Sequence, residues 1–263
     1  MNTDKHRSEK SKDAPSFALT RLFRAHPRVE FLSLRLCVSA VLILLIVSFV
    51  QAQRSGLGWV WQNPLPQGNP LYSIHFAKDK LHGFAVGSDN TILRTRDGGF
   101  RWERQDAPTD VTFSGVWTRD AENAIAVGSR GTIVMTTNGG KDWNRVAVDA
   151  RDHLYSIAFA GADAKTGWIT GTYGRILKTT DGGLTWRTQA VDTKEHILKV
   201  AAFDADHAAA VGLGGTVLFT NDGGANWTVT GPCSGAVVSG VAYTSENSLI
   251  VAGYGGCIAR SND

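Results

Sequence analysis

The candidate acid/base residues of this sequence are the few glutamates that follow residue 52. A sialidase needs an arginine cluster for the substrate carboxylate, a tyrosine nucleophile and an acid/base carboxylate. Each glutamate here stands in a stretch typical of a loop or a strand edge, where a solvated surface charge is the ordinary role. We therefore predict no catalytic residue and keep a glycoside hydrolase of sialidase or endoglucanase type as the alternative. The glutamates are Glu103, Glu122, Glu195 and Glu246.

Metal chemistry has equally little support. The histidines are not arranged in the closely spaced pairs that zinc sites use. Single aspartates recur along the chain, whereas a calcium loop gathers several oxygen ligands. We expect neither a metal nor a cofactor. The histidines after the leader that bear on this are His75, His153, His196 and His207.

The elements that must position any functional side chain recur along the sequence. Residues 179–186 read TTDGGLTW, and related octapeptides occupy residues 95–102, 136–143 and 220–227. Their third position steps by 41, 43 and 41 residues, and an upstream glycine series at 87, 128, 171, 212 and 253 keeps the same steps. Such self-similarity identifies a repeat protein. The third-position residues are Asp97, Asn138, Asp181 and Asp222, and the terminal residues are Trp102, Trp143, Trp186 and Trp227.

Each octapeptide predicts a tight turn between two strands. Asp181 is expected to accept hydrogen bonds from the backbone N–H groups one and two residues further on. Gly182 and Gly183 supply backbone angles that a side chain forbids. Trp186, at the start of the outgoing strand, offers a large apolar surface that anchors the turn. Asn138 can make the same local turn as aspartate.

Four short strand-like stretches fill each period, and no segment has the apolar spacing of a helix. In the third copy they are 154–159, 167–171, 175–179 and 186 onward. Four antiparallel strands per ~40 residues form the blade of a β-propeller, which buries its two faces against neighbouring blades. The sequence predicts an all-β fold, a β-propeller of four-stranded blades with about five blades present.

The octapeptide pattern, Ser/Thr-x-Asp-x-Gly-x-x-Trp, is the Asp-box or bacterial neuraminidase repeat. The longer pattern of residues 167–183 resembles the photosystem II assembly and stability factor family, over about residues 57–263. That resemblance implies a lumenal or periplasmic propeller, seven-bladed in the family, that binds partner proteins without known catalysis. It implies a protein partner, with photosystem II as the family's membrane complex. The sialidase alternative lacks the Arg-Ile-Pro signature of those enzymes. An endoglucanase of the two-propeller kind would need a second propeller, for which this chain is too short.

The first 52 residues differ from the rest and predict an export leader. Residues 1–35 hold eight Lys or Arg and four acids, residues 36–50 carry no charge, and Val50-Gln51-Ala52 has the spacing of a signal-peptidase site. Basic, apolar and small segments in that order form a signal peptide. An uncleaved anchor over residues 36–50 is the alternative. We expect a leader (1–52), a repeat domain (53–263), and a periplasmic or extracellular location, or the thylakoid lumen in a photosynthetic cell.

The net charge of +3 comes from the leader, because the remainder holds 19 basic and 20 acidic side chains. A near-neutral domain gives no reason to expect nucleic acid as a partner. Cys233 and Cys257 could pair after export or remain two small apolar side chains, and the sequence leaves both open.

The two ends of the repeat region complement each other. The fifth copy reaches Ser261-Asn262-Asp263, and reading on into residues 57–61 completes Ser-x-Asp-x-Gly-x-x-Trp with Trp61. Five blades that close through an N-terminal strand, and a truncated seven-bladed propeller, are both compatible with this pattern.

The binding face is predicted from variation between copies. Turns between the second and third strands differ from blade to blade, whereas the Asp-box turns repeat almost unchanged. Arginine and tyrosine are enriched in binding hot spots, and loops on a rigid scaffold commonly carry binding sites. We predict a partner-binding surface that contains Arg130, Tyr173, Arg175, Arg151 and His153.

Overall fold

The computed structural model describes residues 58, 62, 68–161 and 163–261. The chain divides into two compact units, Met1–Trp61 and Gln62–Asp263. The predictions for the leader and its apolar segment lie outside the described residues. In the described part of the chain, no helix has the length and apolar character needed to cross a membrane.

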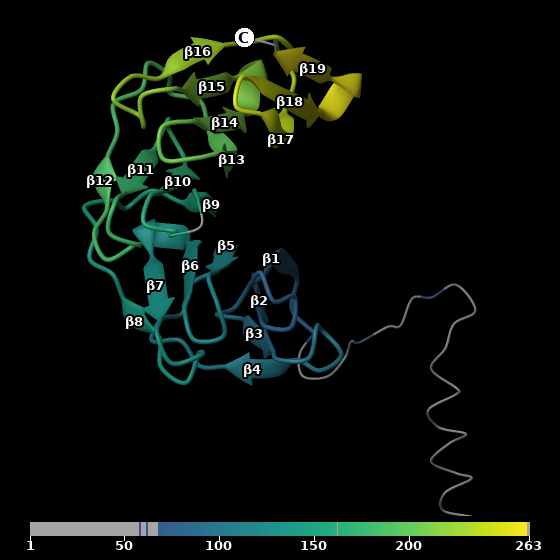
Figure 1. Cartoon of the computed structure of the whole chain (residues 1–263), viewed down its shortest axis with the longest axis vertical. Helices are drawn as coiled ribbons and strands as arrows, with labels where there is room; N and C mark the ends of the chain where they lie inside the picture. Colours follow the sequence, from purple (N-terminus) through teal and green to yellow (C-terminus); the bar gives the residue numbers. More distant parts are fainter. Residues whose placement is uncertain (1–57, 59–61, 63–67, 162, 262–263) are drawn as a thin grey trace, which may run out of the picture. The chain divides into compact units, whose positions relative to one another are not determined.

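The second unit is all-β and consists of successive antiparallel sheets (Figure 1). Its strands follow the predicted four-per-period pattern. The first sheet has β1 (Leu71–Phe76), β2 (Gly83–Gly87), β3 (Ile92–Thr95) and β4 (Glu103–Gln105); the second has β5 (Phe113–Thr118), β6 (Ala124–Gly128), β7 (Ile133–Thr136) and β8 (Asn144–Arg145). The third has β9 (Leu154–Phe159), β10 (Gly167–Gly171), β11 (Ile176–Thr179) and β12 (Arg187–Thr188); the fourth has β13 (Ile197–Ala202), β14 (Ala208–Gly212), β15 (Val217–Thr220) and β16 (Thr228–Thr230). The fifth has β17 (Val238–Ser245), β18 (Ser248–Gly253) and β19 (Ile258–Ser261).

Each sheet is a propeller blade whose strands pair in chain order. The first strands of the five blades, β1, β5, β9, β13 and β17, contact one another in that order. Each blade therefore packs on the next through its first strand, and the predicted β-propeller of Asp-box blades is confirmed.

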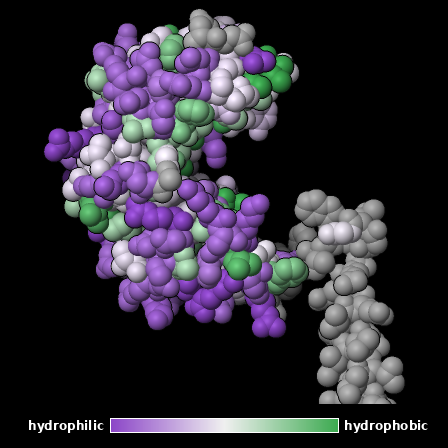
Figure 2. All heavy atoms as spheres, viewed as in Figure 1, coloured by the Kyte–Doolittle hydropathy of each residue, from purple (hydrophilic) through white to green (hydrophobic). Residues whose placement is uncertain are grey.

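The hydrophobic core lies between blades rather than within one. Phe84 of the first blade and Phe113 of the second are fully buried in one cluster, and three further clusters lie at the following blade interfaces. Every residue of the second strands β2, β6, β10 and β14 is buried. A strand covered on both faces reads as a continuous apolar run, which explains the absence of in–out alternation there. On the face of the blades drawn in Figure 2, hydrophilic side chains predominate and apolar ones form only small separate groups.

The structure differs from the predicted strands in two places. The box tryptophans come directly before the fourth strand rather than inside it, since β12 starts at Arg187. The fifth sheet has three strands among the described residues. The predicted joining of residues 57–61 to 262–263 involves residues outside the described part, apart from Gly58.

The recurring glycine at the end of each second strand is required by a close backbone approach. Gly128 and Gly212 have extended backbones, with φ of −168° and −163°. A Cβ atom at these positions would collide with the carbonyl oxygen of Thr112 or His196, which precede the first strands of the same blades. The equivalent pairs are Gly87 with Pro70, Gly171 with His153, and Gly253 with Val237. The glycine at the end of each second strand therefore allows close approach of the backbone that precedes the first strand of the same blade.

Cys233 and Cys257 form a disulfide, with their Cα atoms 5.8 Å apart. Cys233 lies in the link between the fourth and fifth blades, and Cys257 directly precedes β19. The alternative that the sequence left open is thereby decided in favour of pairing.

Candidate partner-binding surface

The box turns emerge at one edge of the blades, which we call the box edge. The Thr179 hydroxyl donates to Asp181 Oδ1 (2.7 Å) and accepts the N–H of Gly183 (3.0 Å). Asp181 Oδ1 also accepts the N–H of Thr185, four residues on (2.9 Å). The predicted partners one and two residues on are wrong, because the turn is wide enough for the carboxylate to reach across it.

The same pattern recurs in the other boxes. Asn138 Oδ1 accepts the N–H of Asp142 (3.0 Å), as an aspartate oxygen does elsewhere. The N–H of Asn226, followed by its side-chain amide and the Thr220 hydroxyl, lowers the pKa of Asp222 to about 2. Asp97 Oδ1 accepts the N–H of Arg101 (2.9 Å). The box carboxylates are engaged within their own turns.

Three of the box tryptophans, Trp143, Trp186 and Trp227, pack at the blade interfaces. Trp143 and Trp186 are buried, with exposed fractions of 4% and 7%, and Trp102 and Trp227 are half-buried. Trp186 packs edge-on against Phe159 and donates its indole N–H to the Gly183 carbonyl (3.0 Å).

Trp102 and Trp227 donate the indole N–H to a glutamine side chain rather than to a turn carbonyl. In the sequence, each glutamine lies three residues after an earlier tryptophan. Trp227 Nε1 donates to Gln189 Oε1 (3.4 Å), and Trp102 Nε1 donates to Gln62 Oε1 (2.9 Å). Gln62 thus has the place of Gln189. The predicted box tryptophan of this segment, Trp61, lies outside the described residues.

The opposite edge, which we call the link edge, joins each blade to the next by hydrogen bonds. In the first four blades, the turn between the second and third strands donates one N–H to its own blade and one to the following link. Ser129 donates to Thr112 O (3.0 Å), and Gly131 donates to Asp152 O (2.7 Å). In the next blade Thr172 donates to His153 O (3.0 Å), and Gly174 donates to Glu195 O (2.8 Å). The turns are therefore fixed on a rigid support.

The tips of these turns need a left-handed backbone. Two blades place glycine at the tip, Gly214 (φ 65°) and Gly255 (φ 73°). The second and third blades place Arg130 (φ 57°) and Tyr173 (φ 55°) there. A left-handed conformation costs a residue other than glycine about 1–2 kcal/mol, and asparagine and aspartate tolerate it best. Arginine and tyrosine at these tips are thus unfavourable for folding.

Both tip side chains extend into solvent. The Arg130 side chain is 76% exposed, and its only ion pair among the described residues is a 3.7 Å contact with the exposed Asp110. Tyr173 is 72% exposed and meets the ring of His196 edge-on, with 5.1 Å between centroids. Neither contact accounts for a large side chain at a left-handed position.

Aromatic rings connect Tyr173 to the first strand of its blade. His196 lies 6.4 Å from Tyr155, and Tyr155 stacks on His153 at 4.7 Å. His153 Nε2 is 2.8 Å from the Ser114 hydroxyl, and burial lowers the pKa of His153. The structure thereby brings the predicted residues His153 and Tyr173 into one cluster. Tyr155 was missed, because a single tyrosine in a strand has no distinguishing sequence signal.

The other two predicted residues differ in role. Arg175 Nε donates to Asp152 Oδ2 (2.6 Å), and Arg175 Nη1 donates to the Thr188 hydroxyl (3.2 Å). Arg175 is therefore committed to holding the link against its blade. Arg151 is exposed in that link. Since Gly131 donates to Asp152, the tip of Arg130 belongs to the same hydrogen-bonded network as Arg175.

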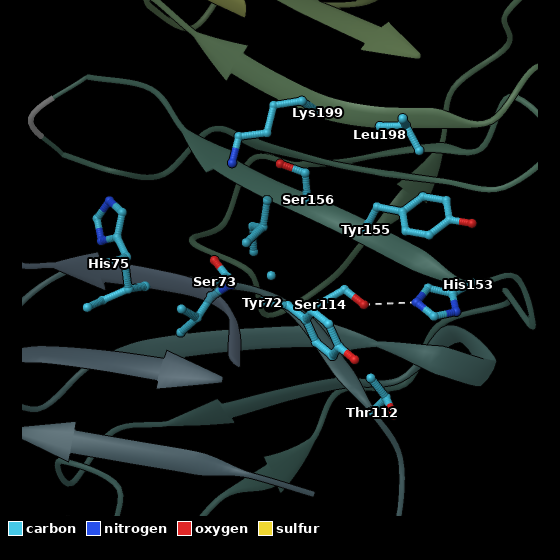
Figure 3. Close-up of a pocket in the computed structure, with 14 residues that line it drawn as sticks. Tyr72, Ser73, His75, Thr112, Ser114, His153, Tyr155, Ser156, Leu198 and Lys199 are labelled. Carbon is cyan, nitrogen blue, oxygen red and sulfur yellow. Dashed lines mark hydrogen bonds between the residues drawn. The ribbon is translucent and has the colours of Figure 1, made fainter. Parts of the chain in front are cut away.

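A pocket of about 520 Å³ lies along the first strands of the first four blades and is lined in part by His153 and Tyr155 of this cluster (Figure 3). Its polar lining includes Ser73, His75, Ser114, Ser156 and Lys199. None of its fourteen lining residues is aspartate or glutamate. The pocket therefore lacks the carboxyl pair that most glycoside hydrolases use.

The four glutamates lie at exposed positions away from this pocket. Glu103 is 3.7 Å from Arg96, and Glu246 is 3.8 Å from His207. Glu122 and Glu195 are exposed. Among the described residues no group of three or more metal-ligand side chains occurs.

Comparison with known proteins gives a family. The model of the family described as Photosynthesis system II assembly factor YCF48 matches residues 56–153 and again residues 143–231. The chloroplastic photosystem II stability/assembly factor HCF136 of Cyanidioschyzon merolae is 47% identical over 49 residues. That alignment covers 18% of this chain and 11% of the relative, so the chain spans a small part of the relative's length.

Solved structures give likenesses at low identity. YCF48 bound to a D1 peptide is 21% identical over 76% of this chain and 79% of that chain, with a TM-score of 0.43. An ancestral GH74 enzyme is 16% identical over 70% of this chain and 27% of that chain, with a TM-score of 0.58. The likeness to the GH74 enzyme concerns the fold alone.

Proposed function

Because this chain belongs to the photosynthesis system II assembly factor YCF48 family, we propose that it is a scaffold that binds a partner protein through its link edge. The observation that carries the proposal is the pair Arg130 and Tyr173. Both are exposed, and both occupy left-handed positions where two other blades have glycine. Side chains kept against a conformational cost are expected where they serve binding.

Several features of the link edge suit a protein partner. Arginine and tyrosine are the side chains that most often dominate binding energy. Tyr173 is backed by His196, and the tips are held by hydrogen bonds to neighbouring links, so little order must be gained on binding. The partner we propose is a protein of a membrane complex of the photosystem II type, and the role we propose is non-catalytic.

The test replaces Arg130 and Tyr173 with glycine in one double variant. Glycine is the residue that the fourth and fifth blades use at this position, so the melting temperature is expected to stay unchanged or to rise. Binding is expected to weaken by at least about tenfold, since truncating hot-spot residues costs about 2 kcal/mol or more. A D1 peptide, which the solved YCF48 complex contains, is the first probe, followed by pull-down from membranes with mass spectrometry.

A matched control lies on the box edge. Leu184→Ala and Phe100→Ala shorten exposed side chains of the box turns, with exposed fractions of 61% and 82%. These variants should bind like the wild type. Loss of binding in them, together with full binding by the glycine double variant, would place the partner on the box edge. Arg175 is left unchanged because its bonds to Asp152 and Thr188 give it a structural role.

We also propose that the protein is exported, with residues 1–52 as its leader. The disulfide between Cys233 and Cys257 supports this, because disulfides persist in oxidising compartments and are rare in the cytosol. N-terminal sequencing of the exported form should give Gln53 as the first residue. A full-length product that remains with membranes after a carbonate wash would instead indicate an anchor over residues 36–50.

A further inference from the structure

The pocket along the first strands is lined by two serine hydroxyls that each accept a backbone N–H from the next blade and can still donate their own hydrogen. Ser73 Oγ accepts the N–H of Val116 on the next blade (3.3 Å). Ser156 Oγ accepts the N–H of Val200 in the same way (3.3 Å). Among the described residues neither hydroxyl has an acceptor for its own hydrogen. Ser156 is only 4% exposed, so few directions other than the pocket remain for its hydrogen.

His75 follows the same rule. Its Nδ1 accepts the N–H of Thr118 (3.0 Å). Burial, partly offset by this hydrogen bond, lowers the pKa of His75, and the ring is therefore neutral at pH 7. A neutral ring whose Nδ1 accepts must carry its proton on Nε2. His75 thus offers the pocket a further N–H donor.

Lys199 supplies the only formal charge of the pocket lining. Within the described part of the chain its amino group has no ion pair or hydrogen bond, and its positive charge is a minor cause of the lowered pKa of His75, after burial. In Figure 3 the amino group of Lys199 and the hydroxyls of Ser156 and Ser73 face the same open space, with His75 beside it. No carboxylate lines the pocket to neutralise this charge.

We propose that this pocket is a binding site for a carboxylate. Two serine hydroxyls, the imidazole of His75 and the ammonium group of Lys199 line one pocket without a carboxylate. Hydrogen bonds between an ammonium group and a carboxylate are stronger than those between neutral groups. A single cation matches a singly charged carboxylate better than a phosphate dianion. This site is separate from the tips of Arg130 and Tyr173 and does not depend on the partner binding proposed above.

The experiment is an NMR titration of the His75 ring in the full-length protein at pH 7.5. Sodium acetate should shift the ring resonances saturably, with a dissociation constant of about 1 mM or weaker for so small a ligand. Lys199→Met should weaken acetate binding at least tenfold. Lys199→Arg should retain most of it. The exposed Lys194, in the link before β13 and outside the pocket, gives the control Lys194→Met, which should bind acetate like the wild type.

A second arm distinguishes the source of the carboxylate. Acetyl-trialanine with a free terminal carboxylate is compared with its amide. Binding of the acid alone identifies a site for a peptide end, and binding of acetate without the peptide identifies a site for small carboxylates; both support the proposal. Absence of a saturable shift, an equal response of the Lys199→Met and Lys194→Met variants, or preference for inorganic phosphate over acetate would overturn it. None of these readouts involves the partner protein, so failure here leaves the proposed function standing.

Discussion

Replacing Trp186 with alanine is expected to lower the free energy of unfolding by about 3–5 kcal/mol, the range for truncating a large buried aromatic side chain. Trp186 is 7% exposed and packs in the cluster between the second and third blades, edge-on to Phe159. Its indole N–H also donates to the Gly183 carbonyl, so the substitution removes a turn contact as well. Urea denaturation monitored by circular dichroism measures the change.

Two substitutions in the same box serve as comparisons. Asp181→Ala should cost less than Trp186→Ala, because the aspartate accepts hydrogen bonds at an exposed position and fills no core volume. Leu184→Ala should change the free energy of unfolding by about 0.5 kcal/mol or less, as is usual for an exposed site. Equal, near-zero effects of Trp186→Ala and Asp181→Ala would mean that the box does not stabilise the fold.

The fold was predictable because the same turn pattern occurs four times at nearly constant spacing. A single Asp-Gly turn is uninformative, but four copies at nearly constant spacing define strand number and blade size together. Two strands of the third blade, β9 and β10, have the predicted bounds. The box hydrogen bonds were predicted less well. The reach of Asp181 across to Thr185 depends on the width of the turn, which the residue types alone do not specify.

The candidate site was predicted only in outline. Variation between copies singled out Arg130 and Tyr173, but their backbone strain became evident only with φ angles. Arg175 had the right residue type, yet its ion pair with Asp152 gives it a structural role. The pocket proposed to bind a carboxylate had no sequence signal, since the hydrogen bonds that place Ser73 and Ser156 come from backbone N–H groups of the next blade.

The recurring glycine is a second sensitive point of each blade. Gly212→Ala is expected to cost about 3 kcal/mol, the upper end of the usual range for overpacking. The new Cβ would collide with the carbonyl oxygen of His196, and that oxygen accepts the N–H of Leu213 (2.9 Å). Relief would require the backbone of the link to move, which would break this hydrogen bond and disturb the ring contact between His196 and Tyr173.

Gly231→Ala is the matched control for Gly212→Ala. Gly231 lies in the next link, and a Cβ there would come no closer than 3.8 Å to a neighbouring atom, so its stability should stay within about 0.5 kcal/mol of wild type. Comparison of the two urea midpoints isolates the effect of the close approach from the general effect of replacing glycine. If Gly212→Ala were as stable as Gly231→Ala, the glycine series would have to be explained by something other than the backbone contact. Because His196 supports Tyr173 at the link edge, we also expect Gly212→Ala to weaken partner binding, whereas Gly231→Ala should leave it unchanged.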